Sequence, residues 1–277
     1  MNLPPQFQFS QSSLQDFVDC PRRFYYRYVL DLQYPAPQSA PLQDFELHMQ
    51  QGEQFHRLAQ QAIIKIDPAA IEETIDDDRV FGWWQNFRAS GLVGLPDKQR
   101  CPEITLSVPL AGRRLVAKYD LIALGEDRAV IVDWKTALKP PRRDTLERRL
   151  QTIIYPYVLV KAGAHLNDGQ PIPPENVSMM YWFTEFPDQP QVFSYSAAKF
   201  AEDGAYLERL AADLLARSDE TAFPLTDEVY KCKFCTYRSL DQRGVKAGDF
   251  RDQADDEPEQ APGVLGVSLD QIAEIEF

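Results

Sequence analysis

Two carboxylates and a lysine stand close together in the middle of the chain, on two runs of strand-forming residues. The runs cover residues 114–123 and 128–132, and a Gly-Glu-Asp turn separates them, which predicts a β-hairpin. Asp120 belongs to the first run, and Asp133 and Lys135 follow at the end of the second. Because strand side chains alternate between faces, the side chains of Asp133 and Lys135 should project from the same face.

These residue types suit metal-dependent hydrolysis of a phosphodiester. Mg²⁺ and Mn²⁺ prefer oxygen ligands, commonly carboxylates, water and a substrate phosphate. A bound ion lowers the pKa of its water and neutralises charge on the phosphoryl group, and a nearby lysine can orient that water or offset developing negative charge. The alternative is an ordinary exposed hairpin with scattered charges, since acids and lysines are common at strand ends.

Four motifs resemble those of the RecB-like branch of the PD-(D/E)XK nucleases. That branch includes the C-terminal nuclease domain of the AddB helicase-nuclease subunit and the CRISPR-associated RecB-like exonucleases. A D-x-K motif alone is a weak signal, but the ordered set of a G-x-x-x-H helix, a first acid, D-x-K and Q-x-x-x-Y is specific. The matching residues are Gly52 to His56, Asp120, Asp133-Trp134-Lys135, and Gln151 with Tyr155.

The resemblance implies a role for each of these residues. Lys135 would assist the attacking water, while Gln151 and Tyr155, four residues apart on one helix face, would position the site and the DNA. The Trp134 backbone carbonyl would add a metal contact. The implied ligands of Mg²⁺ or Mn²⁺ are His56, Asp120 and Asp133.

A second set of residues resembles an iron–sulfur site. In the same nuclease branch an early cysteine joins a C-x2-C-x5-C group around a 4Fe–4S cluster, and this chain offers Cys20, Cys232 and Cys235 but has Asp241 in the last position. Thiolates are the preferred cluster ligands. The expectation is a cluster in some form, with Asp241 as fourth ligand. A labile or three-iron cluster, a zinc site and a lost site with packed cysteines are the alternatives.

The fold implied by the resemblance is α/β, a restriction-endonuclease-like mixed central sheet flanked by helices. Residues 1–244 would form the nuclease domain, with a helical insertion at about 34–100 and a cysteine-containing terminal subdomain. Residues 245–277 are acidic and Pro-rich, which indicates a flexible linker and a short C-terminal tail.

Residue patterns outside the motifs predict further elements. Tryptophans at 83 and 84 belong to a helix predicted over residues 71–90, with core packing as their role. A pair of strands is expected on either side of Pro187-Asp188. Glu103, at the start of a strand-like run, is a secondary candidate to approach the active site, as first-strand acids do in some of these nucleases.

The formal net charge of −13 counts against a protein that coats nucleic acid over its whole surface. However, residues 100–149 carry eleven Lys and Arg against seven Asp and Glu, which fits a phosphate-contacting face inside an acidic protein. No run of apolar residues approaches membrane-spanning length. The first residues lack the basic and apolar regions of a signal peptide, so a cytoplasmic protein without a membrane partner is expected.

The resemblance implies an exonuclease that acts on single-stranded DNA ends in repair or recombination. No Gly-rich nucleotide-binding loop is found, so any unwinding requires a partner helicase. Two alternatives remain open. One is a CRISPR adaptation nuclease with the same chemistry, and the other is a DNA-binding or scaffolding subunit that cleaves weakly or not at all. The second draws support from the missing cysteine and from the absence of the usual glycine shortly before Asp120.

Overall fold

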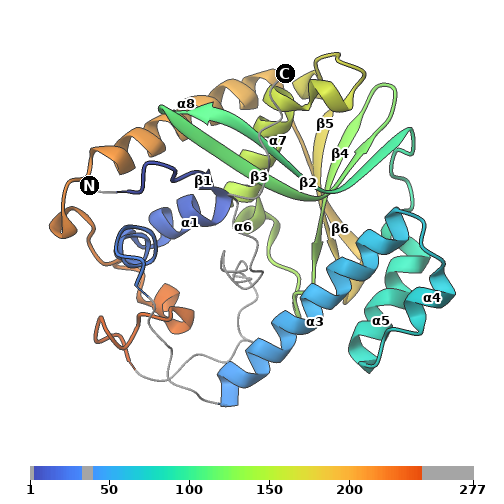
Figure 1. Cartoon of the computed structure of the whole chain (residues 1–277), viewed down its shortest axis with the longest axis horizontal. Helices are drawn as coiled ribbons and strands as arrows, with labels where there is room; N and C mark the ends of the chain where they lie inside the picture. Colours follow the sequence, from blue (N-terminus) through green and yellow to red (C-terminus); the bar gives the residue numbers. More distant parts are fainter. Residues whose placement is uncertain (1–2, 33–39, 245–277) are drawn as a thin grey trace.

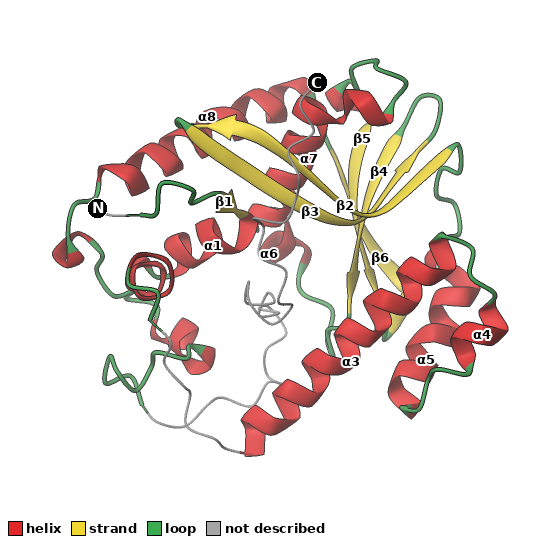
Figure 2. Cartoon of the chain, viewed as in Figure 1, coloured by secondary structure: helices red, strands yellow, loops and turns green. Residues whose placement is uncertain are grey.

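A six-stranded mixed sheet forms the centre of the molecule (Figures 1 and 2). The computed structural model describes residues 3–32 and 40–244. The strand order is β1-β3-β4-β5-β6, and β2 pairs with β3; the β1–β3 and β4–β5 pairs are parallel and the others antiparallel. The strands are β1 Phe9–Ser10, β2 Gln99–Leu110, β3 Arg113–Leu124, β4 Ala129–Lys135, β5 Val177–Phe183 and β6 Phe186–Ser194.

Helices cover both faces of this sheet, as Figure 2 shows. On one face α1, α7 and α8 pack over a large core, and on the other α3 and α5 pack over a second core that is rich in tryptophan. The helices are α1 Gln11–Asp19, α2 Pro21–Phe24, α3 Ala40–Ile63, α4 Pro68–Glu72, α5 Asp78–Asn86, α6 Arg143–Arg148, α7 Leu150–Ala162 and α8 Ala197–Ala216.

Helix α7 lies in the middle of the larger core. Nine of its residues are buried, and it runs through Pro156 as one helix of 13 residues. Such a helix, apolar on nearly all sides, is stable only between other elements. Its burial fixes the N-terminal end of α7, where Gln151 lies, against the sheet.

Helix α3 is held on the opposite face by its apolar side chains. Phe55 is fully buried and stacks on Trp182 of β5, with ring centroids 6.3 Å apart. Trp83 and Trp84 of α5 are buried in the same core, which confirms their predicted packing role. This packing places His56, the residue after Phe55, at the edge of the sheet.

The sheet opens where β3 and β4 leave each other. Their antiparallel ladder pairs Leu121 with Val132 and continues to Leu124 with Ala129. Beyond Leu121 the described ladder stops, and Asp120 Oδ2 instead accepts a hydrogen bond of 2.8 Å from the Trp134 N–H. The first acid and the D-x-K motif therefore face each other at a gap between two strands.

The predicted fold class is confirmed, and two predicted elements need correction. The helix expected over residues 71–90 is divided into α4, α5 and a π-helical turn, Phe87–Gly91. The turn expected at Pro187-Asp188 lies earlier in the chain, at Thr184 and Glu185. Pro187 and Asp188 themselves belong to β6. Proline is tolerated there because β6 is an edge strand.

Two sequence expectations concern other parts of the chain. The predicted acidic linker and tail, residues 245–277, lie outside the described residues. None of the helices among residues 3–32 and 40–244 is both long and apolar enough to cross a bilayer.

Candidate active site

Three elements bring an imidazole and two carboxylates together. His56 comes from α3, Asp120 from β3 and Glu103 from β2, and one ligand atom of each lies within 4.8 Å of the other two. His56 Nδ1 is 3.3 Å from Asp120 Oδ1. Within the part of the chain that the structure describes, this is the group of His, Cys, Asp and Glu side chains with the spacing to hold a metal ion. The donor set of one nitrogen and two carboxylates suits Mn²⁺ or Mg²⁺.

Mutual attraction keeps His56 and Asp120 charged. Burial disfavours the imidazolium, but the negative charges of Asp120, Asp133 and Glu103, with a hydrogen bond that the imidazole donates to Asp120, raise the pKa of His56 to about 9. Burial also disfavours the Asp120 carboxylate. His56 and the Trp134 N–H outweigh that effect and hold the pKa of Asp120 below its usual value. The acid therefore remains ionised, as a metal ligand must be.

Asp133 and Lys135 lie side by side on β4, as strand alternation predicts. Lys135 Nζ is 2.9 Å from Asp133 Oδ2, and both side chains are at least nine-tenths buried. Gln151 of α7 donates a hydrogen bond to the other oxygen, Asp133 Oδ1. The charge of Asp133 reaches the buried Tyr181, whose pKa is raised by burial and by that carboxylate. The D-x-K pair and the glutamine thus form one buried polar unit.

The structure divides the predicted site residues into neighbouring groups. His56 and Asp120 lie with Glu103, while Asp133 is held by Lys135 and Gln151. The two groups are in electrostatic contact, because Asp133 acts on His56 and Lys135 acts on Asp120. All five predicted residues of these groups therefore surround one small region between β3 and β4.

Tyr155 is buried and contacts β3 through Tyr119. Its ring packs 4.8 Å from that of Tyr119, and its backbone carbonyl accepts a 2.9 Å hydrogen bond from the Tyr119 hydroxyl. Tyr119 directly precedes Asp120. Tyr155 therefore supports the strand that carries the first acid.

The glycine of the G-x-x-x-H motif lies at a close approach of two elements. A Cβ at Gly52 would be 3.3 Å from Oγ1 of Thr136, the residue after Lys135. Such a distance is at the tight limit of ordinary packing. Gly52 thus lets α3 come near the end of β4, which brings His56 towards the acids.

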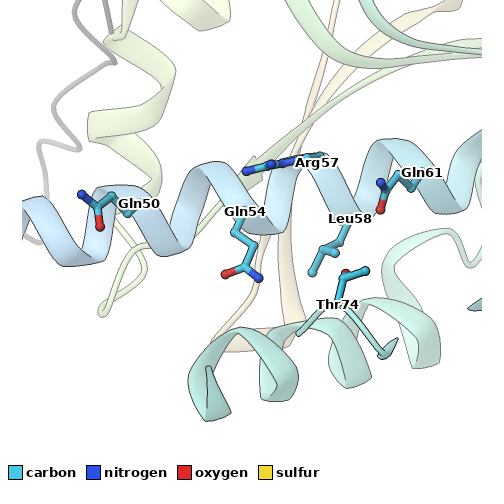
Figure 3. A pocket seen from close by; sticks show the side chains of 6 residues that line it. All are labelled: Gln50, Gln54, Arg57, Leu58, Gln61 and Thr74. Carbon is cyan, nitrogen blue, oxygen red and sulfur yellow. The ribbon is translucent and has the colours of Figure 1, made fainter. Parts of the chain in front are cut away.

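An open polar groove lies on the outer side of α3 (Figure 3). Its lining residues do not include those of the metal-binding group. Its lining residues are Gln50, Gln54, Arg57, Leu58 and Gln61 of α3, with Thr74 from the segment after α4.

The predicted iron–sulfur residues lie on segments from the two ends of the described chain that contact each other. Within the described residues, these four side chains do not have the ligand-atom spacing found for His56, Glu103 and Asp120. Cys20 begins α2, and Cys232 lies in a 3-10 helix, Val229–Phe234. Burial raises the pKa of the Cys235 thiol to about 11, with smaller contributions from Cys20 and Cys232. Asp241 acts on Cys232 and accepts a 2.8 Å hydrogen bond from the Tyr26 hydroxyl. The four cysteines of the chain are all free thiols.

Polar contacts join these two ends independently of the cysteines. Lys231 Nζ lies 3.0 Å from a carboxylate oxygen of Asp19, and Arg22 Nε donates a 2.7 Å hydrogen bond to the Phe223 carbonyl. The Tyr237 hydroxyl donates to the Leu32 carbonyl at 2.9 Å. These contacts place the cysteine pair beside the N-terminal helices.

A mixed α/β sheet with an acid on one strand, D-x-K on the next and a histidine on a packed helix defines a class of metal-dependent nuclease folds. The family model for the PD-(D/E)XK nuclease superfamily matches residues 8–240, and the chain belongs to that superfamily.

The comparison with solved structures adds two distant likenesses. One is the structure of SSO0001, at 15% identity and a TM-score of 0.42, covering 86% of this chain and 87% of that one. The other is a "Putative exonuclease" from Eubacterium rectale, at 12% identity and a TM-score of 0.46, covering 75% and 80%. No curated protein matches.

The close approach at Gly52 gives a testable coupling. Gly→Ala inside a helix normally stabilises by about 1 kcal/mol, but in Gly52→Ala the new methyl would press on Thr136, so we expect little or no gain. In a Thr136→Ala background, which removes the opposing atoms, the same substitution should stabilise by the full amount. Urea unfolding of the four proteins measures the difference. Equal effects in the two backgrounds would show that the approach does not constrain α3.

Proposed function

We propose that this protein is a metal-dependent nuclease of the RecB-like branch that hydrolyses phosphodiester bonds of DNA, as an exonuclease on single-stranded ends. The observation that carries the proposal is the convergence of His56 and Asp120 with the Asp133–Lys135 pair at the gap between β3 and β4. The superfamily assignment supports hydrolysis of a nucleic acid.

Each residue has a role in the proposed reaction. A bound divalent cation would supply a more acidic water and neutralise charge on the phosphate. His56, Asp120 and Asp133, with the Trp134 carbonyl, would hold that cation. Lys135 would orient the attacking water and offset the negative charge that develops on the phosphoryl oxygens.

Gln151 would keep the carboxylate of Asp133 in place. Its amide donates to Asp133 Oδ1, which leaves Oδ2 turned towards Lys135. Tyr155 would act through Tyr119, by supporting the strand of Asp120. Both residues are positioning residues in this proposal.

Removing the acid or the lysine tests the proposed chemistry. Asp133→Ala and Lys135→Ala should each slow Mn²⁺-dependent cleavage of an end-labelled single-stranded oligonucleotide by about 10²-fold or more, the usual cost of losing a charge-stabilising group. The matched control is Arg209→Ala, an exposed residue of α8, which should cleave as the wild type does. Circular dichroism melting must show all three variants folded. Undiminished cleavage by either active-site variant would refute the proposed mechanism, and no cleavage by the wild type would favour a non-cleaving subunit.

The segment between β4 and α7 is proposed as the phosphate-contacting surface. Residues 139–149 hold five Lys and Arg against two acids. Arg142 and Arg148 are each 72% exposed by side chain and share Asp144 as a partner. Arg143 is anchored on β6, where it donates to the Val192 carbonyl at 2.8 Å and lies 4.2 Å over the Phe193 ring. The segment is thus a fixed basic surface directly before Gln151.

Salt dependence distinguishes phosphate contacts from other effects. The double variant Arg142→Ala/Arg148→Ala should bind single-stranded DNA more weakly, and the slope of log affinity against log salt should fall by about 0.7 for each lost contact. The double variant Arg79→Ala/Arg209→Ala removes the same charge from two exposed positions elsewhere and should keep the slope. Fluorescence anisotropy in Ca²⁺ measures both. Identical slopes for the two double variants would exclude this surface.

We also propose that Cys20, Cys232, Cys235 and Asp241 hold a 4Fe–4S cluster that joins the N-terminal helices to the C-terminal segment. The contacts that join the segments of Cys20 and Cys232, and the hydrogen bond from Tyr26 to Asp241, support this site. Since thiolate is the better ligand, Asp241→Cys should slow the bleaching of the visible cluster absorption in air. Cys232→Ser should abolish the cluster absorption itself. Anaerobic purification with iron and zinc analysis provides the measurement. One zinc per chain and no iron would identify the zinc alternative.

A role in repair or recombination, with a helicase as partner, follows from the RecB-like motifs, because this sequence carries no unwinding motif of its own. CRISPR adaptation would use the same active site.

A further inference from the structure

The first strand of the β2–β3 hairpin is irregular opposite Asp120. The ladder pairs Pro102 with Leu121 and then Ile104 with Tyr119. Glu103 and Asp120, which lie between these pairs, are not paired in the ladder described for the two strands. Glu103 has a φ of +53°. This left-handed conformation is unusual for a residue that is not glycine, and it costs free energy that the surrounding structure must supply.

The irregularity changes the face to which β3 presents its side chains. Ala117 and Tyr119 face the core beneath α7, but Leu121 and Ala123 face the core beneath α3. A regular strand would keep every second residue on one face, so the alternation slips by one residue at Asp120. On β2, Ile104 and Leu106 belong to the core beneath α7, so the preceding Glu103 lies on the α3 side, where His56 lies.

The result is an acid within ligand distance of both His56 and Asp120. The three side chains within 4.8 Å of one another are His56, Glu103 and Asp120. Asp133 is close by but has one oxygen on Gln151 and the other on Lys135. Glu103 in turn has Lys118 Nζ at 2.6 Å, and the lysine side chain is 58% exposed. A mobile exposed ammonium can leave that carboxylate more easily than the buried Lys135 can leave Asp133.

We propose that Glu103 is a direct ligand of the divalent cation, together with His56 and Asp120, and that its left-handed backbone is retained for this purpose. This inference rests on the proposed function, because it names a further ligand of the same site. Lys118 competes with the cation for the Glu103 carboxylate.

Two substitutions separate the ligand from the backbone strain. Glu103→Gly accepts a positive φ without cost, so it should melt at a higher temperature than the wild type without metal and should bind Mn²⁺ at least tenfold more weakly. Glu103→Gln keeps the side-chain size and the strain, so it should bind Mn²⁺ equally weakly with an unchanged melting temperature. Electron paramagnetic resonance of free Mn²⁺ measures affinity, and differential scanning calorimetry measures melting. Wild-type Mn²⁺ affinity in Glu103→Gln would overturn the inference.

Lys118 provides an internal control with the opposite sign. Lys118→Gln should tighten Mn²⁺ binding, because it removes the competing ammonium. Part of that gain is a general charge effect, which should persist in the double variant Lys118→Gln/Glu103→Gln. The remainder depends on the carboxylate and should disappear there. A gain of equal size with and without Glu103 would contradict direct ligation.

Asp120→Asn separates failure of this inference from failure of the proposed function. If Asp120→Asn weakens Mn²⁺ binding and Glu103→Gln does not, the metal site stands and Glu103 is not a ligand. If neither substitution weakens binding, the metal site itself is refuted and Glu103 with it. Loss of affinity in both variants supports Glu103 as a ligand of the proposed site.

Discussion

The separation of β3 from β4 at Asp120 is the constraint on which the site depends. A regular ladder would use the Trp134 N–H to join the two strands, but here the Asp120 carboxylate accepts that hydrogen bond. The acid therefore replaces a strand partner and satisfies a backbone donor that would otherwise be costly to bury. The same hydrogen bond fixes the position of β4, which carries the D-x-K motif, relative to Asp120. One polar contact therefore determines where β3 and β4 separate and how far apart they lie.

Charge balance follows from this geometry. Two carboxylates, Glu103 and Asp120, lie close together, and the buried Asp133 lies on the neighbouring strand. Such an arrangement is stable only with compensating cations. Lys135 compensates Asp133, Lys118 compensates Glu103, and His56 compensates Asp120. Each acid thus has its own basic partner. An incoming divalent cation would compete with two of these partners, the imidazole proton and the Lys118 ammonium, while the lysine proposed for catalysis remains beside Asp133.

The sequence allowed prediction of the parts of the site that depend on local periodicity. The placement of Asp133 and Lys135 on one face follows from strand alternation, and the position of Gln151 on a helix follows from its apolar spacing. The proximity of His56 to Asp120 could be inferred only from motif order, because a helix 64 residues away in sequence is positioned by tertiary packing. Glu103 was a weak candidate since its role depends on a local interruption of the β2–β3 ladder. Pro102 was the available signal, because a proline inside a strand often marks an irregular ladder.

The contacts between the two ends of the described chain make a closed ring of the polypeptide. Asp19 with Lys231, and Arg22 with Phe223, join segments about two hundred residues apart through charge and hydrogen bonding. Closing so long a loop carries an entropic cost that these bonds, with the stacking of Phe24 on Phe223, already meet. Oxidative loss of the proposed cluster beside Cys20 would then leave the ring shut, and the nuclease sheet would keep its flanking helices through episodes of oxidation.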